Sequence, residues 1–394
     1  MRSAGWWSVR AVVAIMIAAS LTTGAARAAD AEIAALVAKV RAVKPMGAGH
    51  KEAAVAIREL TKADGAKLPD LLAGFDGADV LAANWLRGAV EAVAQRTLDK
   101  GGKLPIADLE TFLAQTTHAP RGRRLAYELI ARVDAQAETR LIPGLIDDPS
   151  LELRRDAVAL ALKNAEAKLA AGDKEAAAAG FRRAFRSSRD QDQVKTAAAK
   201  LRDLGDKVDL PTHYGFVMNW KLVAPFDNVG GKGFDVAYPP EREVDLKAEY
   251  KAEHMGKESK IGWVEHATTD DYGLVDLNKA LAKHKGAIAY AYAEFVAPRD
   301  MEVDFRLGSD CANKVWLNSE LVTSNQVYHA NMVLDQYIGK AKLKKGRNQI
   351  LLKIAQNEQT EAWAQDWKFQ FRVCDSIGTA VLSQDRAAGQ TAAR

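Results

Sequence analysis

The chain has 394 residues, of which 48% are hydrophobic and 27% are charged. This composition is that of a folded globular protein rather than a disordered chain, and the length allows two or three domains. The formal net charge of +4 falls to +1 if the first 28 residues are removed with their three arginines, so the charge offers no argument for nucleic acid binding.

Residues 1–28 have the pattern of a secretory signal peptide. An apolar core of 11 residues runs from Ala11 to Leu21, and Ala26 to Ala28 form a small-x-small cleavage pattern. The apolar run is well short of the roughly 20 residues that span a bilayer. We therefore expect cleavage after Ala28, export to the periplasm or the extracellular space, and a mature protein that is not embedded in the membrane.

Residues 29–162 show a repeated helical pattern. A basic residue, followed two positions later by alanine and then by an apolar helical face, occurs at Lys51, Arg87, Arg124 and Arg155. The spacings of 36, 37 and 31 residues match one helical hairpin with its turns. Acidic residues lie among the arginines of residues 121–124 and 182–189, which favours a solvated helix face over a basic patch.

The last copy of the repeat is the sharpest. Its acidic turn contains Pro149 and Ser150, and Leu153, Ala157 and Val158 then form one apolar stripe. This segment resembles a HEAT-type helical repeat, which implies an α-solenoid over residues 29–162 with a surface for a protein partner. Residues 163–206 resemble a single tetratricopeptide-like hairpin, which we expect to cap that solenoid.

Near residue 207 the composition changes to aromatic, glycine and proline residues, and alternation replaces the helical period. The expected strands share this alternation and are bounded by turn residues; they are 215–223, 288–296, 301–307, 314–317, 333–338, 349–354 and 367–373. Within 301–322, two apolar alternations flank a polar turn. Residues 207–380 are therefore predicted to form an antiparallel sandwich or barrel.

Several short motifs carry a resemblance to a known family. They are the segment from Trp220 to Asn228 (WKLVAPFDN), the segment from Gly308 to Asp310, the segment from Val315 to Asn318 (VWLN), and the segment from Leu343 to Asn348 followed by ILLK. Together they resemble the galactose-binding-like, jelly-roll β-sandwich that is fused to helical repeats in exported Planctomycetes-type proteins. Cys311 stands where such domains often have a second acid, which argues against a calcium or sugar site at that turn.

Cys311 and Cys374 are the two cysteines of the chain, and both fall in the predicted sandwich. One disulfide and two unpaired, packed cysteines are both compatible with an exported protein. The sequence contains no CxxC or Cys/His spacing for zinc and no phosphate-binding or nucleotide-binding fingerprint in a suitable context. We expect no metal and no cofactor.

The densest group of amide, acid and indole side chains is QNEQTEAWAQDW, residues 356–367. A sugar ring offers hydroxyls to amides and carboxylates and an apolar face to an indole. The predicted carbohydrate-binding residues are Gln356, Asn357, Glu358, Gln359 and Trp363. The alternative is a loop whose tryptophans cap the core, and the alternating strand that begins at Trp367 favours a core role for that residue.

No catalytic residues are assigned. Glu265, His266, Asp270, Asp271 and Asp276 lie close in sequence, but aspartates beside Gly273 are typical turn residues. The sequence favours a non-catalytic binding or scaffold protein that contacts protein through its helices and a polysaccharide or the cell envelope through its sandwich. A polysaccharide-active enzyme and a purely structural envelope component are the alternatives. Residues 381–394 are expected to be a disordered tail.

Overall fold

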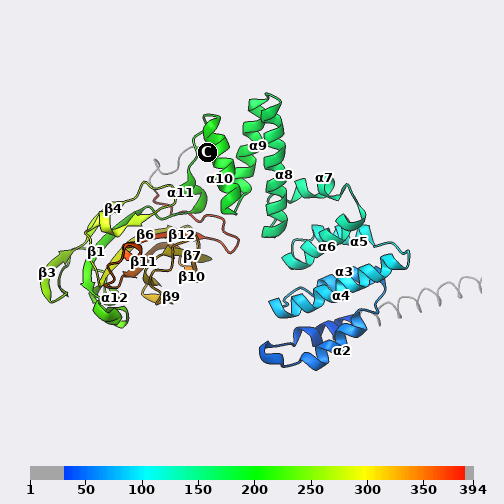
Figure 1. Ribbon diagram of the computed structural model, residues 1–394, viewed down its shortest axis with the longest axis horizontal. Coiled ribbons are helices and arrows are strands. Elements are labelled where there is room, and N and C mark those ends of the chain that lie inside the picture. Colours follow the sequence, from blue (N-terminus) through cyan, green and yellow to red (C-terminus); the bar gives the residue numbers. More distant parts are fainter. Residues whose placement is uncertain (1–30, 387–394) are drawn as a thin grey trace, which may run out of the picture. The chain divides into compact units, whose positions relative to one another are not determined.

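The computed structural model describes residues 31–386 (Figure 1). Helices occupy residues 31–203 and antiparallel strands follow from residue 219, so the chain has the expected two-part α plus β fold. The predicted signal peptide lies outside the described residues. Among residues 31–386, no helix combines the length and apolar character that a membrane span requires.

The chain divides into two compact units, Met1–Asp173 and Lys174–Arg394, which we call the helical unit and the β unit. This division differs from the predicted domain boundary near residue 207. The hairpin of α9 (Lys174–Ser187) and α10 (Gln191–Asp203) was expected to cap the repeats, but it belongs to the β unit. The physical reason is a shared apolar cluster in which Val194 and Ala198 of α10 pack with Tyr214 and Phe216.

The helical unit is a succession of short helices joined by tight turns. After a helix that includes residues 31–41, its α-helices are α2 (His50–Leu60), α3 (Leu68–Ala73), α4 (Val80–Asp99), α5 (Ile106–Ala114), α6 (Pro120–Val133), α7 (Ala137–Leu141) and α8 (Leu151–Ala170). Helix α3 contacts α4 and α5, and α6 contacts α3, α4, α5, α7 and α8. Most of the buried residues of α4 are alanines, whose small side chains let neighbouring helices approach closely.

A buried ion pair fixes the turn at Pro149 and Ser150, which belongs to the sharpest copy of the repeat. Arg123 of α6 donates to both carboxylate oxygens of Asp148, at 2.7 and 2.6 Å, and its Nε donates to the Leu113 carbonyl at 2.8 Å. Asp148 also accepts from the Ser150 backbone N–H, and its carbonyl accepts from Arg154. The bidentate geometry and the additional hydrogen bonds satisfy charges that burial would otherwise make costly.

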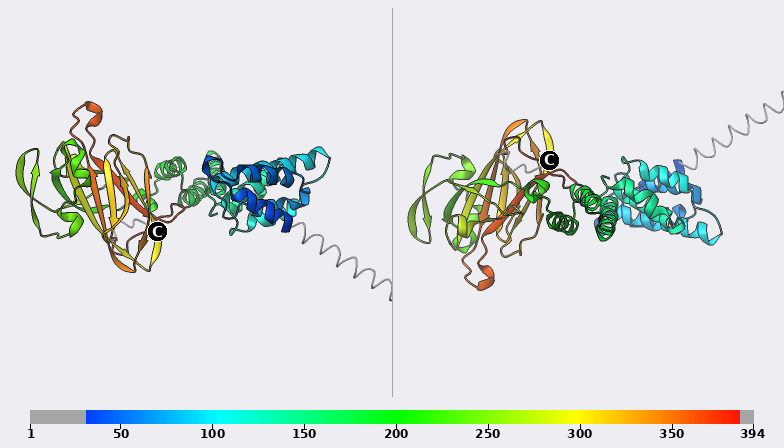
Figure 2. Two further views of the ribbon diagram at one scale, coloured as in Figure 1. Left: turned by 90° about the horizontal axis from the view of Figure 1, so that it is seen from below. Right: turned by 90° about the horizontal axis from the view of Figure 1, so that it is seen from above.

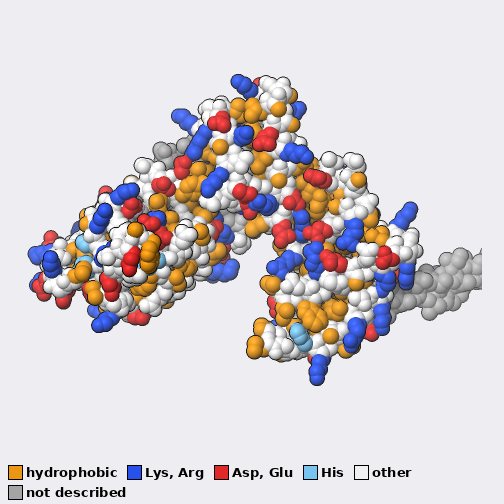
Figure 3. Space-filling model, viewed as in Figure 1, with side chains coloured by type: hydrophobic (Ala, Val, Ile, Leu, Met, Phe, Trp, Pro, Cys, Tyr) orange, Lys and Arg blue, Asp and Glu red, His pale blue; other side chains and the backbone are white. Residues whose placement is uncertain are grey.

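Two arginines of this unit form ion pairs with acids on neighbouring helices. Arg87 of α4 contacts Glu128 of α6 at 2.6 Å, and Arg124 contacts both Glu128, at 3.0 Å, and Asp156 of α8. Figure 3 shows acidic and basic side chains mixed over the visible face of these helices. These ion pairs agree with the expectation of a solvated face and link α4 to α6 and α6 to α8.

The β unit contains two packed sheets and a separate hairpin (Figures 1 and 2). Its strands are β1 (Asn219–Asp227), β2 (Glu249–His254), β3 (Lys257–Gly262), β4 (Val264–Ala267), β5 (Val275–Asp276), β6 (Ala287–Ala297), β7 (Met301–Ser309), β8 (Ala312–Leu317), β9 (Glu320–Asn325), β10 (Tyr337–Leu343), β11 (Gly346–Ala355) and β12 (Lys368–Cys374). The strand orders are β4-β1-β6-β11-β8-β9 and β10-β7-β12-β5, with β2 pairing β3, and every pairing is antiparallel.

Both faces of the six-stranded sheet are covered. Between the sheets lie Trp220, Phe305, Phe369 and Phe371, with the alanines of β6. The other face packs Tyr290 and other aromatic residues against the segment from Phe234 to Ile261. Short helices α11 (Leu210–Tyr214), α12 (Pro239–Arg242) and α13 (Leu277–Ala280) complete the unit.

Lys353 holds the segment 234–241 against the six-stranded sheet. Its side chain is fully buried, and its ammonium group donates to the carbonyls of Phe234 and Val236, at 2.9 and 2.8 Å, and to Glu241 at 2.7 Å. Three acceptors match the three donors of an ammonium group. A lysine within the apolar second half of β11 therefore holds the segment 234–241 against this strand.

One of the predicted strands is corrected by the structure. The predicted strand 333–338 is mostly loop, because Asp335 has a φ of 59° and turns its carboxylate toward Arg306 and Arg372; β10 begins only at Tyr337. The turn at Asp310 and Cys311 carries the chain from the four-stranded sheet to the six-stranded sheet, so β7 and β8 do not form a hairpin.

The predicted disordered tail is wrong for residues 381–386. The Val381 backbone N–H donates to Val373 at 2.9 Å, and the Gln384 N–H donates to Val296 at 3.0 Å. The Ser383 hydroxyl accepts from the Val296 N–H at 2.7 Å. These bonds bring residues 381–384 alongside β12 and β6, a long-range pairing that composition does not reveal.

His213 makes the β unit sensitive to acid. Its ring packs on Phe185 at 4.4 Å between centroids, and burial, with the charges of Arg189 and Arg372, lowers its pKa from 6.5 to about 4. The unfolded chain binds a proton at this residue at higher pH than the folded protein does. Stability should therefore fall as the pH drops from about 6.5 to 4, by up to about 3 kcal/mol.

Urea unfolding of wild type and His213→Phe at pH 7 and pH 4.5 tests this prediction. The variant should lose less stability on acidification than wild type, because phenylalanine keeps the ring contact and cannot be protonated. Equal losses in the two proteins would contradict the assignment.

Candidate functional site

Three loops meet at the end of the six-stranded sheet where β6 begins. The side-chain amide of Asn228, just after β1, donates to the Gln356 carbonyl at 2.9 Å and to the Tyr328 hydroxyl at 3.1 Å. The Gly230 backbone N–H donates to Glu358 at 3.0 Å. Residues from about 228 to 231, 328 to 332 and 356 to 366 are thus hydrogen-bonded into one surface, which we call the loop surface.

Trp363 is the prominent apolar side chain of the loop surface. It lies in a 3-10 turn, Ala362–Ala364, and remains 63% exposed. The His329 ring stands nearly perpendicular to it, at 85° with centroids 4.9 Å apart. The amide of Gln365 donates to the carbonyls of Thr360 and Glu361, at 2.6 and 2.9 Å, which fixes the turn that carries the indole.

The predicted carbohydrate residues have different environments in the structure. Gln356 is only 2% exposed and its amide donates to the His284 carbonyl, so it supports the loop and does not present its side chain at the surface. Asn357 and Gln359 are half-buried and joined by a 2.7 Å hydrogen bond. Glu358 is exposed and bound to Gly230.

The structure adds a histidine that the sequence pattern did not single out. His329 Nε2 lies 3.0 Å from Asn357 Oδ1, in addition to its contact with Trp363. The spacing of the histidines along the sequence matches no metal-binding motif, so it gives no reason to single out His329. Only the approach of two loops that are 28 residues apart in the chain places His329 beside Asn357.

The two cysteines are both buried and free. Cys311 Sγ lies near the Asp366 carbonyl, just before β12 begins, whereas Cys374 is the last residue of β12. The length of β12, about 20 Å at roughly 3.3 Å per residue, separates them, and a disulfide needs Cα atoms within about 7 Å. Of the two alternatives left open by the sequence, the structure has the unpaired one.

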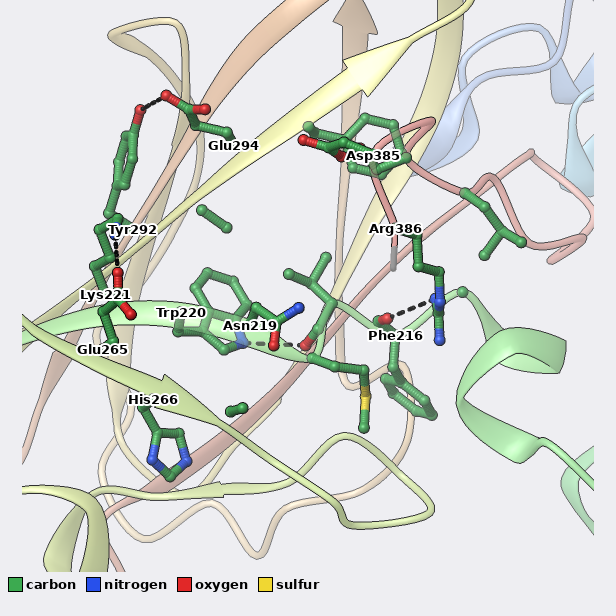
Figure 4. Close-up of a pocket in the computed structure, with 18 of the residues that line it drawn as sticks. Phe216, Asn219, Trp220, Lys221, Glu265, His266, Tyr292, Glu294, Asp385 and Arg386 are labelled. Atoms are coloured by element: carbon green, nitrogen blue, oxygen red, sulfur yellow. Dashed lines mark hydrogen bonds and ion pairs between the residues drawn. The ribbon is translucent and has the colours of Figure 1, made fainter. Parts of the chain in front are cut away.

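A cavity of about 530 Å³ lies at a different place in the β unit, near the end of β6 (Figure 4). It opens where the chain before Asn219 leaves β6 and pairs instead with β12, through Val217 and Phe216. Its lining combines Phe216, Met218, Trp220 and Phe295 with charged groups; these are Lys221, Glu265, Glu294, Asp385 and Arg386.

The acids beside this cavity are engaged with neighbouring residues. Glu265 forms a 2.8 Å ion pair with Lys221, whose hydrogen bond lowers the pKa of Glu265. Burial lowers the pKa of His266, which favours the neutral imidazole. Asp270, close to them in sequence, accepts from the backbone N–H groups of Tyr272 and Leu274 and stabilises a turn, as expected.

Within residues 31–386, no group of three or more histidine, cysteine or acidic side chains is arranged to hold a metal ion. The loop surface and the cavity offer hydrogen bonds, aromatic contacts and charges.

No family model and no curated protein matches this chain. Among solved structures, similar ones include an anti-sigma factor domain-containing protein from Clostridium clariflavum, with 10% identity over 44% of this chain and 49% of that chain and a TM-score of 0.23. An alpha-xylosidase from Xanthomonas citri matches with 19% identity over 30% of this chain and 15% of that chain, with a TM-score of 0.18.

A beta-glucosidase from Kluyveromyces marxianus in complex with glucose matches with 12% identity over 73% of this chain and 36% of that chain, with a TM-score of 0.24. This chain covers less than half the length of each of these three structures. TM-scores of this size carry no argument about fold or function.

The two tryptophans of this segment should respond differently to truncation. Trp367 is fully buried and its indole N–H donates to the Ile354 carbonyl at 3.2 Å, so Trp367→Ala should cost roughly 3–5 kcal/mol of folding free energy. Trp363→Ala should change stability by less than about 1 kcal/mol, since the side chain is mostly exposed. Denaturant titration of both variants measures the contrast, and similar losses would contradict the distinction between a core and a surface indole.

Proposed function

We propose that this chain is an exported, non-catalytic binding protein whose β unit binds carbohydrate at the loop surface. The single observation that carries the proposal is the large exposed face of Trp363 on a turn that is fixed by hydrogen bonds. An exposed indole gains from burial against the apolar face of a sugar ring, and a fixed turn reduces the entropy lost on binding.

The neighbours of Trp363 supply the polar part of such a site. Asn357, Glu358 and Gln359 provide amide and carboxylate groups beside the indole, and His329 adds an imidazole. Each of these groups already makes at least one hydrogen bond within the protein, which orients it and leaves capacity for a sugar hydroxyl. Gln356 supports the site indirectly, because its side-chain amide binds the His284 carbonyl and so holds the loop in place.

The same proposal includes a more detailed architecture for the helical unit and for the β unit. We take the helical hairpins of residues 31–162 as a HEAT-like α-solenoid. The turn at Asp148 and the ion pairs that link α4, α6 and α8 support this interpretation. The sheets of the β unit are taken as a galactose-binding-like jelly roll. The solenoid would then contact a protein partner while the β unit contacts a polysaccharide or the cell envelope.

A glycan array tests the proposal. The full mature chain should bind a subset of the glycans, and Trp363→Ala should weaken that binding at least tenfold because the stacking surface is lost. Leu321→Ala is the matched control, since Leu321 is also an exposed apolar residue, 55% accessible, on strand β9. The control should bind as wild type does.

Two outcomes would contradict the proposal. Absence of binding to every glycan would favour a purely structural envelope component. Hydrolysis of a polysaccharide that disappears in Glu358→Gln would favour the enzyme alternative.

A further inference from the structure

The loop surface carries acidic side chains and no lysine or arginine. Its three segments, 228–231, 328–332 and 356–366, contain three acids, which are Glu358, Glu361 and Asp366. Trp363 follows Glu361 by two residues, so the exposed indole lies on an acidic turn. The charge of this surface bears on which sugars it can bind.

Two of the three acids have no cationic partner. Asp366 forms an ion pair with Lys368 at 2.6 Å, and Lys368 also lies 3.4 Å from Asp310. Glu358 is exposed and accepts one backbone N–H through a single carboxylate oxygen, at 3.0 Å. Glu361 is exposed as well. Within residues 31–386, neither of these two carboxylates lies within ion-pair distance of a lysine or arginine.

The lysines that flank the loop surface offset its charge only in part. Lys285 donates to the Ala364 carbonyl at 2.7 Å, and burial lowers its pKa. It attracts Glu361 through space but does not form an ion pair with it. Lys232 directly follows the segment 228–231, is exposed, and has no ion pair within the described part of the chain. Negative charge therefore remains beside Trp363.

An ammonium group suits an indole that lies among carboxylates. The face of an indole attracts a cation, and a carboxylate accepts strong, charge-assisted hydrogen bonds from an ammonium group. An acidic sugar would instead bring a third negative charge to Glu358 and Glu361 and be repelled. An amino sugar combines the cation with an apolar ring face that can stack on Trp363.

We propose that the loop surface binds a polysaccharide with free amino groups, of the glucosamine type. One ring stacks on Trp363, and its ammonium group pairs with Glu358 or Glu361. This inference rests on the carbohydrate function proposed above and names the class of sugar. A linear polymer repeats the charge at every ring, so a contribution that is weak at one exposed site is gained by many equivalent rings.

Titration calorimetry of the full mature chain with two hexasaccharides tests the inference. Oligomers of glucosamine and of N-acetylglucosamine share one backbone and differ in the charge of the amine. At about pH 5.5, where amines are protonated and carboxylates in general are ionised, the glucosamine oligomer should bind at least fivefold more tightly. In about 0.5 M NaCl the preference should fall below twofold, because salt screens exposed charges.

Paired variants connect this preference to the two acids. Glu358→Gln combined with Glu361→Gln should reduce the preference below twofold, because glutamine keeps the shape of the side chain without its charge. Glu302→Gln combined with Glu320→Gln is the matched control. It removes two exposed glutamates at the starts of β7 and β9, the strand ends away from the loop surface, and should keep the wild-type preference. Trp363→Ala should weaken binding of both oligomers at least tenfold.

The outcomes separate this inference from the proposed function. Equal or tighter binding of the N-acetylglucosamine oligomer would overturn the inference and leave the carbohydrate function standing. The same holds if the Glu358→Gln and Glu361→Gln double variant retains the preference, or if a galacturonic acid oligomer binds as tightly as the glucosamine oligomer. Failure of every glycan to bind would contradict the proposed function and this inference together.

Discussion

The β unit depends on the burial of β6 on both faces. Strand β6 lies between β1 and β11, and its sequence alternates alanine with larger residues. Its alanines face the second sheet, where small side chains leave room for Trp220 and the phenylalanines of β7 and β12. Ile288, Tyr290 and Tyr292 face the opposite way. A strand that is apolar on both sides requires a covering on each.

The two coverings are held by different interactions. The four-stranded sheet covers one face through apolar contacts. The other face is covered by the segment from Phe234 to Ile261, and the backbone carbonyls in the first part of this segment would be costly to bury without donors. Lys353 supplies those donors to Phe234 and Val236, and Glu241 balances its charge. This buried lysine stabilises the covering only as part of that network, since an unpaired ammonium group would destabilise it.

The loop surface and the cavity lie near the two ends of β6, where its regular pairing stops. At its beginning, loops after β1 and β11 join through Asn228 and the Gln356 carbonyl and present Trp363. Toward its end, β1 leaves for the other sheet and the cavity opens beside Arg386. A continuous sheet uses its backbone groups in pairing, so binding groups gather where strands separate or end.

The sequence by itself determined the class of the fold and the strands β1, β6, β7, β8, β11 and β12. Helical periodicity before residue 203, and alternation in β6, β7, β11 and β12, are local patterns that follow from which side chains must be buried. The polar strands β2, β3, β4 and β9 were missed, because exposed edge strands such as β3 carry no apolar alternation. The core role of Trp367 was also correctly predicted from its place in an alternating strand.

The tertiary structure decided which side chains and segments contact one another. Sequence indicated the segment 356–367 as polar and aromatic, but only the fold buries Gln356 and brings His329 to Trp363. The separation of Cys311 from Cys374 and the order of residues 381–386 likewise depend on which strands lie side by side. Periodicity records whether a side chain is buried, whereas the contacts of a site depend on pairings between distant segments, which a local pattern does not encode.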